Sequence, residues 1–293
     1  MALVRRLIKS SFVLGTGDFG TQGQNQLDIS GLRTMVDVIY AGGNAMGTME
    51  LAIYGMTLSH MNALSTLGMI YTQKRRNSVT VSAGNETDGY ATVFQGTITS
   101  AWPDMQGMPD VPFRVSAATG LIDALAPVDP VSVKGSADAA TLLSGLANKM
   151  GLRFENNGVN VKLSNAYYPG SARSQAQAII RDAGIEWNTG TNGVLAIWNP
   201  GQPRGGTSIL ISKDTGMVTA PVYTSNGIIV RTLFNPSMGL GSKIHVDTIL
   251  KLYPATGDFV VYGLNHHLDC LMPKGRWFSD VQAAPPGSGP FTP

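Results

Sequence analysis

The segment His266–Cys270, which reads HHLDC, is the densest group of side chains that could bind a metal ion or act as a nucleophile. Successive side chains of a strand point to opposite faces, so His266 can share a face with Cys270, and His267 with Asp269. A tetrahedral zinc site needs four ligands. The remaining histidines, at no ligand spacing, are His60 and His245. We therefore expect no metal here, and we expect Cys270 to be a small buried residue.

Carboxylates are the second group with catalytic potential, because acid–base hydrolysis uses paired carboxyl groups in different surroundings. The chain has four glutamates, which are Glu50, Glu86, Glu155 and Glu186. Each is expected in or beside a strand or turn, and none has a distinctive context. The P-loop, nucleophile-elbow and H-E-x-x-H motifs do not occur in the sequence. The sequence thus predicts no enzyme, no cofactor, and no catalytic, cofactor-binding or metal-binding residues.

The segment Gly15–Gly20, GTGDFG, has the G-x-G-x-x-G spacing of dinucleotide-binding loops. Such a loop must open a helix whose N-terminus holds the pyrophosphate. TQGQNQ follows instead and carries no helical period, so we interpret the glycines as a Gly-rich connection.

Charged residues are few: 21 Lys and Arg stand against 19 Asp and Glu, a net charge of +2. The two basic groups, Lys74–Arg76 and Arg5, Arg6 and Lys9, are interpreted as solvated or salt-bridged contacts. A charge this small does not supply the attraction that nucleic-acid binding requires. Basic residues also interrupt the apolar N-terminus, which we therefore read as part of the mature protein, and no apolar run approaches the ~20 residues of a membrane-spanning helix. We expect neither a membrane nor sequence-specific nucleic acid as a partner.

The charged fraction of 14% is well below the ~25% of an average soluble domain. Much of the surface must therefore be neutral, as in a subunit buried in an assembly or in a Gly-rich β protein. The single cysteine cannot form an internal disulfide, which favours synthesis in a reducing compartment.

The elements that would position these residues form a β–α+β–β series. After an N-terminal arm over 1–30, residues 31–118 are predicted to form a first tube-like β-barrel domain. Residues 49–55 alternate with Leu51 and Ile53 on one face, and 78–83 and 91–102 are rich in Val, Thr and aromatic residues.

Residues 119–203 are predicted to be an α+β region in which a helix-hairpin unit occurs twice. Ser136 is expected to cap the first helix, and Gly151 to end it. Asn157-Gly158 then predicts a hairpin within RFENNGVNVKL. The second helix is predicted over 171–183, ending at Gly184, and the second hairpin turns near Asn192-Gly193.

Residues 204–282 are predicted to form a second tube-like β-barrel domain, and 283–293 a flexible Pro/Gly tail. The two β regions share a strand, a loop around an Asn (Asn62 or Asn235), a second strand and a return with Gly96 or Gly263 at its middle. This parallel indicates either a duplication or convergent hairpin composition.

The third region resembles the C-terminal half of the baseplate hub proteins of contractile-tailed bacteriophages. The family's pattern joins I-S-x-x-T-G-x-x-x-x-P to G-I-x-V-x-x-L-F-N-P, a G-x-x-I strand, a G-x-x-x-V-x-x-x-x-H-x-x-D hairpin and a Trp before the last strand. The matching positions are Ile211, Ser212, Thr215, Gly216, Pro221, Gly227, Ile228, Val230, Leu233, Phe234, Asn235, Pro236, Gly241, Ile244, Gly257, Val261, His266, Asp269 and Trp277. The resemblance spans most of residues 30–282.

The resemblance implies a structural virion protein made in the host cytoplasm. It would form a homotrimer whose two barrels per chain give a pseudo-sixfold ring. That ring would join the tail tube to the central spike and contact other baseplate subunits.

Three alternatives remain open from the sequence. A tail-tube or distal-tail protein would need one barrel. A cell-wall hydrolase would use Glu50, Glu155 or His267. A carbohydrate-binding β module would line one face with tryptophans, which are Trp102, Trp187, Trp198 and Trp277.

Overall fold

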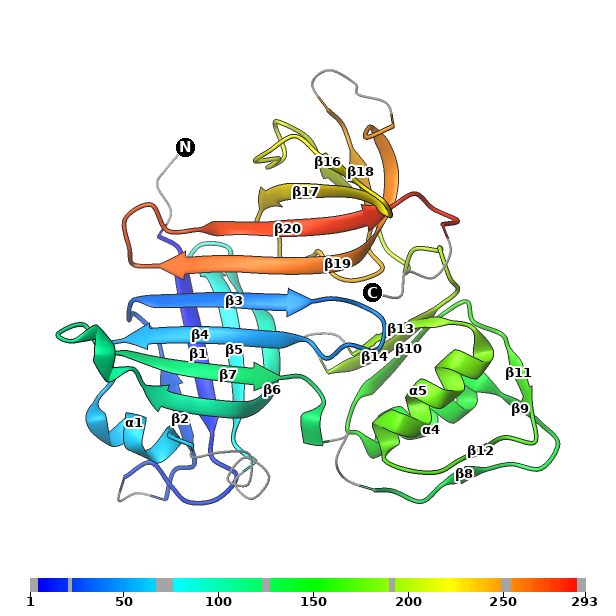
Figure 1. The fold of residues 1–293 in the computed structure, drawn as a ribbon, viewed down its shortest axis with the longest axis horizontal. Helices are drawn as coiled ribbons and strands as arrows, with labels where there is room; N and C mark the ends of the chain where they lie inside the picture. The colour runs from blue at the N-terminus through cyan, green and yellow to red at the C-terminus, as the bar shows by residue number, and fades with distance from the viewer. Residues whose placement is uncertain are drawn as a thin grey trace. The chain divides into compact units, whose positions relative to one another are not determined.

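The computed structural model describes residues 5–20, 23–66, 76–122, 127–189, 193–248 and 254–288. Strands dominate, which confirms the mainly β class, and the chain divides into two compact units. Unit 1 comprises Met1–Ile39, Gly47–Thr119 and Asn265–Phe278. Unit 2 comprises Tyr40–Met46, Gly120–Leu264 and Ser279–Pro293. The strands β19 (Gly257–Cys270) and β20 (Trp277–Ala284) run through both units (Figure 1).

Unit 1 is a sheet with the strand order β2-β1-β5-β6-β7-β4-β3-β19. Its strands are β1 (Leu7–Val13), β2 (Gln26–Ile29), β3 (Thr34–Tyr40), β4 (Thr48–Tyr54), β5 (Ser78–Asn85), β6 (Gly89–Pro103) and β7 (Pro112–Ala118). Consecutive pairs from β2 to β3 are antiparallel. The pairing register of β6 shifts once against β5 and once against β7, and such irregularities bend a strand. The helix α1 (Leu58–Leu64) and the 3-10 turn η1 (Met105–Gly107) lie in the connections.

The core of unit 1 lies on one face of this sheet. Alternate residues of β3 and β5 are buried, as a half-buried strand requires, and β4 alternates up to Leu51, after which Ala52 is buried as well. In β4 these include Leu51 and Ile53, as the alternation predicts. Aromatic rings fill the centre: Phe12, Phe94 and Phe113 are fully buried.

Where the sequence predicts an arm over 1–30, the structure has two sheet strands. β1 pairs with β5 from Leu7↔Gly84 to Val13↔Ser78, and β2 pairs with the other side of β1. Ile8, Ser10 and Phe12 are buried on alternate positions of β1, but the polar Ser10 among them and the basic residues Arg5, Arg6 and Lys9 hide the pattern in the sequence.

Two glycines in long strands allow close approach, and they predict unequal effects of the same substitution. A Cβ on Gly96 would lie 2.6 Å from the Ala118 carbonyl oxygen and 2.8 Å from the Phe94 ring. A Cβ on Gly263 would meet the Gln282 side chain at 2.7 Å, and that side chain can turn away. We expect Gly96→Ala to destabilise the protein by about 2 kcal/mol, and Gly263→Ala by less than about 1 kcal/mol. Thermal unfolding of both variants checks this, and equal midpoints would contradict it.

Unit 2 contains an α+β region between 120 and 199. The helices α4 (Ala139–Lys149) and α5 (Ala172–Ala183) contact each other, and both pack on a three-stranded sheet with the order β10-β14-β13. The strands of this region are β8 (Val131–Ser132), β9 (Ser136–Asp138), β10 (Arg153–Asn157), β11 (Lys162–Ser164), β12 (Tyr167–Tyr168), β13 (Glu186–Thr189) and β14 (Val194–Trp198). The second helix agrees with its prediction, because Ser171 caps α5 and Gly184 ends it at φ 62°.

The first helix-hairpin unit differs from its prediction. Ser136 begins β9, and the cap of α4 is Asp138, whose carboxylate accepts from the Thr141 N–H at 3.0 Å. Asn157-Gly158 does not join a hairpin, since β10 pairs in parallel with β14 and β11 pairs with β9. The Asn157 amide instead donates to the Ile197 carbonyl at 3.2 Å, so tertiary pairing overrides the local turn signal. β13 and β14 do form an antiparallel pair, whereas Asn192 lies outside the described residues.

The rest of unit 2 is a sheet with the order β16-β17-β20-β19, on which β18 pairs with β19 and β15 pairs with β18. The additional strands are β15 (Ile209–Ile211), β16 (Val222–Thr224), β17 (Gly227–Leu233) and β18 (Lys243–Val246). Ala283 and Ala284 belong to β20 instead of the predicted tail, and residues 289–293 lie outside the described residues.

Candidate functional site

The HHLDC segment lies on β19, and its side chains alternate between faces. His266 is buried, and burial lowers its pKa to about 4, so this imidazole is neutral at pH 7. Cys270 is buried as predicted, and its Sγ contacts the Leu32 carbonyl oxygen at 3.4 Å. Within the described residues, three or more His, Cys, Asp or Glu side chains nowhere form a group that could hold a metal ion.

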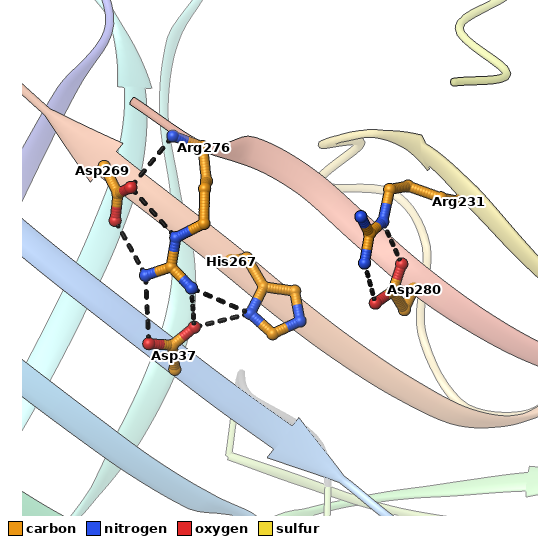
Figure 2. A network of polar contacts seen from close by, with 6 residues as sticks. All are labelled: Asp37, Arg231, His267, Asp269, Arg276 and Asp280. Carbon is orange, nitrogen blue, oxygen red and sulfur yellow. Dashed lines mark hydrogen bonds and ion pairs between the residues drawn. The ribbon is translucent and has the colours of Figure 1, made fainter. Parts of the chain in front are cut away.

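The other face of this segment enters a polar network in unit 1. Figure 2 shows the Arg276 guanidinium between two carboxylates, with distances of 2.8 and 3.1 Å to Asp37 and two of 3.0 Å to Asp269. His267 Nδ1 lies 2.5 Å from Asp37 Oδ1. The hydrogen bonds that Arg276 donates to these carboxylates raise its pKa, the bond to Asp269 more than the bond to Asp37. The network ties β3 to the β19–β20 hairpin.

A second bidentate pair lies in unit 2. Arg231 on β17 donates to Asp280 on β20 at 2.6 and 2.8 Å (Figure 2). Both networks join neighbouring strands of a sheet, so their geometry indicates a structural role.

Each of the four glutamates has surroundings of its own. Glu50 accepts from the Ser116 hydroxyl at 2.8 Å, and Glu86 is exposed in the β5–β6 turn. Arg204 donates to Glu155 at 2.8 and 3.2 Å, and Trp198 Nε1 donates to Glu186 at 2.7 Å.

Glu155 and Glu186 predict pH effects of opposite sign. Hydrogen bonds from Arg204 lower the pKa of Glu155. The charged Glu155 therefore stabilises the fold at pH values above the pKa that this carboxyl has in the unfolded chain. This stabilisation is lost as the pH falls through the lower pKa of the folded state. Burial raises the pKa of Glu186, so the fold loses stability as pH rises from the unfolded value through the folded one. At pH 7 we expect Glu155→Gln to cost no more than about 1 kcal/mol, because the Glu155 side chain is 40% exposed. Glu186→Gln should stabilise the protein.

Chemical unfolding of both variants between pH 3 and 8 measures these differences. Both should vanish at the acidic end. Two variants that change stability in the same direction at pH 7 would contradict the assignment.

The glycine motif and the N-terminal basic group also have structural positions. Gly15–Gly20 connects β1 to β2, where the Leu14 N–H donates to the Asn25 carbonyl at 2.8 Å. Lys9 lies over the Tyr90 ring at 3.7 Å, and Arg6 lies 5.7 Å from the Trp277 ring centre. Lys74 and Arg75 fall outside the described residues.

The tryptophans do not form one exposed face. Trp187, Trp198 and Trp277 are each less than 10% exposed, while Trp102 is 41% exposed. Trp187 and Trp198 line the same cavity, in unit 2.

The edge of the unit 2 sheet carries several exposed apolar side chains. β16 stands at the end of the strand order, paired only with β17 among the described strands. Just before it, Val218 N donates to the Arg231 carbonyl at 2.8 Å, so this segment also follows β17. Large apolar side chains remain exposed on and near this edge: Leu210 46%, Val218 48%, Val222 62%, Tyr223 51% and Leu233 47%. We call these five residues the apolar edge.

The apolar edge is neutral and adjoins a hollow. Residues 215–230 contain no charged side chain. Leu210 and Leu233 line a cavity of about 330 Å³ together with Phe234 and Pro236. β16 is not among the strands predicted from the sequence, although Pro221 and the uncharged run were available signals. A neutral sheet edge with exposed apolar side chains is typical of a surface that another chain covers.

Most of the chain matches a known protein family. Residues 19–271 match the protein family described as "Baseplate hub gp41". No curated protein sequence matches the chain significantly. Within the described residues, no helix has the length and apolar character needed to cross a bilayer.

Solved structures with a similar fold include tail proteins. The 43 kDa tail protein of prophage MuSo2 from Shewanella oneidensis has a TM-score of 0.60 at 10% identity, covering 96% of this chain and 97% of its own. A tail protein from Neisseria meningitidis MC58 has a TM-score of 0.62 at 10% identity, covering 96% and 98%. The E. coli c3393 protein, a type VI secretion system component described as similar to T4 tail proteins gp27 and gp5, has a TM-score of 0.59 at 8% identity, covering 89% and 76%.

Proposed function

Because the chain belongs to the baseplate hub gp41 family, a family of structural proteins of the virion tail, we propose that it forms a trimeric, pseudo-sixfold ring that joins the tail tube to the central spike. Two sheet-bearing units per chain would give six such units in a trimer. Such a ring can match a sixfold tube on one side and a threefold spike on the other.

The apolar edge is the observation that carries this proposal. An isolated chain would leave β16 with free N–H and C=O groups beside exposed Val222 and Tyr223, which is the kind of edge that soluble monomers protect. Covering this edge with the next copy would remove apolar surface from water without burying any charge from residues 215–230.

The ends of the strand order suggest how copies meet. β16 lies at one end and β2 at the other, so a contact of β16 with the next copy's outer strand is heterologous and closes into a ring by rotation. In this arrangement each sheet would complete a tube-like barrel. The α+β region, whose own core is separate, is free to contact other baseplate subunits.

Electron microscopy of assembled particles tests the location. A label fused to this chain should appear in three copies at the junction of tube and spike, after synthesis and assembly in the host cytoplasm. A label repeated along the tube, or in six copies at the tail tip, would instead support the tail-tube or distal-tail alternative.

The remaining alternatives are favoured by no specific observation. For the hydrolase, Glu50 binds Ser116, Glu155 binds Arg204 and His267 binds Asp37, so each proposed catalytic residue has a structural partner. For the carbohydrate module, three of four tryptophans are buried.

A further inference from the structure

Unit 2 contains a second cavity, of about 270 Å³, which is bounded by α5, the β13–β14 pair, the residues Gly42–Asn44 and β19. The apolar part of its wall comes from six side chains that are each less than 10% exposed: Ile180, Ile185, Trp187, Trp198, Leu240 and Val261. A cavity of ~150 Å³ is large enough to bind benzene, so this one has room for a substituted aromatic ring.

Hydrogen bonds within the wall hold both tryptophans in place. Trp187 Nε1 donates to Asn44 Oδ1 at 3.2 Å, and Trp198 Nε1 donates to Glu186 Oε2 at 2.7 Å. The segment that carries Asn44 lies against β19, where a Cβ on Gly42 would come within 2.5 Å of the Tyr262 carbonyl oxygen. The shape of the cavity is therefore set before any ligand enters, which lowers the cost of binding.

Glu186 is the polar group of the wall that can still accept hydrogen bonds. An ionised carboxylate offers about four lone-pair positions, and the donors to Glu186 are Trp198 Nε1 and the Gly201 N–H. In the described part of the chain, no basic side chain forms an ion pair with it. Burial raises the pKa of Glu186, so its charge is incompletely compensated and a donor supplied by a ligand would stabilise it.

The charges around the cavity favour an uncharged ligand. The Arg181 side chain lines the cavity, and the guanidinium carbons of Arg173 and Arg204 lie 5.0 and 5.9 Å from the ring centres of the two tryptophans. This positive charge opposes a cationic ligand, while Glu186 opposes an anionic one. A neutral aromatic ring can pack against the indoles in offset or edge-to-face geometry at no such cost.

We propose that this cavity is a binding site for a small, uncharged aromatic molecule whose O–H or N–H group donates a hydrogen bond to Glu186. Phenols and indoles have this chemistry. The tyrosine side chain of another protein has it too, and the experiment below separates the two sources. The site is independent of the ring, because all of its residues belong to one unit of one chain.

Fluorine NMR titration of the full chain with 4-fluorophenol and 4-fluorotoluene tests the site. The two probes have nearly the same shape, and the methyl group of the second replaces the donor of the first. We expect 4-fluorophenol to bind at least roughly tenfold more tightly, because a ligand without the donor leaves the Glu186 acceptor unpaired. Equal affinities, or the absence of saturable binding of 4-fluorophenol, would overturn the proposal.

The variant Glu186→Gln locates the hydrogen bond. Its amide has a single oxygen, which can keep the bond from Trp198 but no longer offers a second acceptor oxygen. The affinity for 4-fluorophenol should fall to about that for 4-fluorotoluene, whose own affinity should not change. Glu50→Gln is the matched control, because it makes the same change at an exposed carboxylate of unit 1 and should leave both affinities unaltered. A preference for 4-fluorophenol that survives in Glu186→Gln overturns the assignment.

A comparison of 4-methylphenol with the peptide Gly-Gly-Tyr-Gly-Gly separates the two sources of the ring. The cavity has room for one substituted ring, so the free phenol should bind, whereas the peptide adds main chain on both sides of the same group and should bind at least roughly tenfold more weakly. A peptide that binds as tightly as 4-methylphenol would show that the cavity takes a side chain of another protein, which overturns the small-molecule site.

Discussion

The double substitution Val222→Lys/Tyr223→Lys should convert the proposed trimer into a folded monomer. Both side chains are more than half exposed, so the isolated chain should keep its unfolding midpoint, as is usual for surface substitutions. In the ring the same positions would be covered, and two unpaired ammonium groups at an apolar contact are costly to bury. We expect association to weaken at least roughly tenfold, or by ~1.4 kcal/mol or more. Sedimentation of variant and wild type at matched concentrations measures this.

The matched control is Tyr167→Lys, which also replaces an exposed aromatic side chain, on β12 of the α+β region. It should leave the trimer intact. If the double variant remains trimeric, or if the control dissociates equally, the apolar edge is not the contact between copies.

Removing the guanidinium of Arg276 should have the largest effect on stability. Its partner Asp269 has a side chain only 4% exposed, so Arg276→Met leaves a buried carboxylate with a single backbone donor, the residue 276 N–H. Breaking a buried ion pair by removing one partner costs about 3 kcal/mol. The lost contact with Asp37 adds little to this cost, because the Asp37 side chain is 38% exposed and screened by solvent. The thermal unfolding midpoint should fall by several degrees.

Lys213→Met provides the control, because the Lys213–Asp214 pair is 61% and 75% exposed. Removing this pair should change stability by less than about 0.5 kcal/mol. Equal midpoints for Arg276→Met and Lys213→Met would show that the network contributes no more than a surface pair.

The sequence predicts elements well where local signals and tertiary packing agree. α5 has Ser171 as its cap, apolar residues at helical spacing and Gly184 in the left-handed region, so its bounds are predictable. Asn157-Gly158 is an equally strong local signal, yet the prediction was wrong. The partner of β10 is the parallel strand β14, whose Val194 pairs with Arg153 from 41 positions away.

The candidate sites depend on distances in sequence that patterns do not encode. Arg276 reaches Asp37 across 239 positions, and periodicity carries no information on such a pair. β16 has only three residues, which is too short to show alternation, although the uncharged run around it is visible in the sequence. The low charged fraction of the sequence therefore predicted a neutral surface. That the uncharged run around β16 lies at the edge of the unit 2 sheet could be seen only in the structure.

The central claim, a ring of three chains, is tested most directly by the mass of the purified protein in solution. Light scattering coupled to size-exclusion chromatography should give three times the 31.0 kDa of one chain. Averaged images of the same species should show approximate sixfold symmetry. A stable monomer that fails to assemble with tube or spike proteins, or a sixfold mass, would contradict the account.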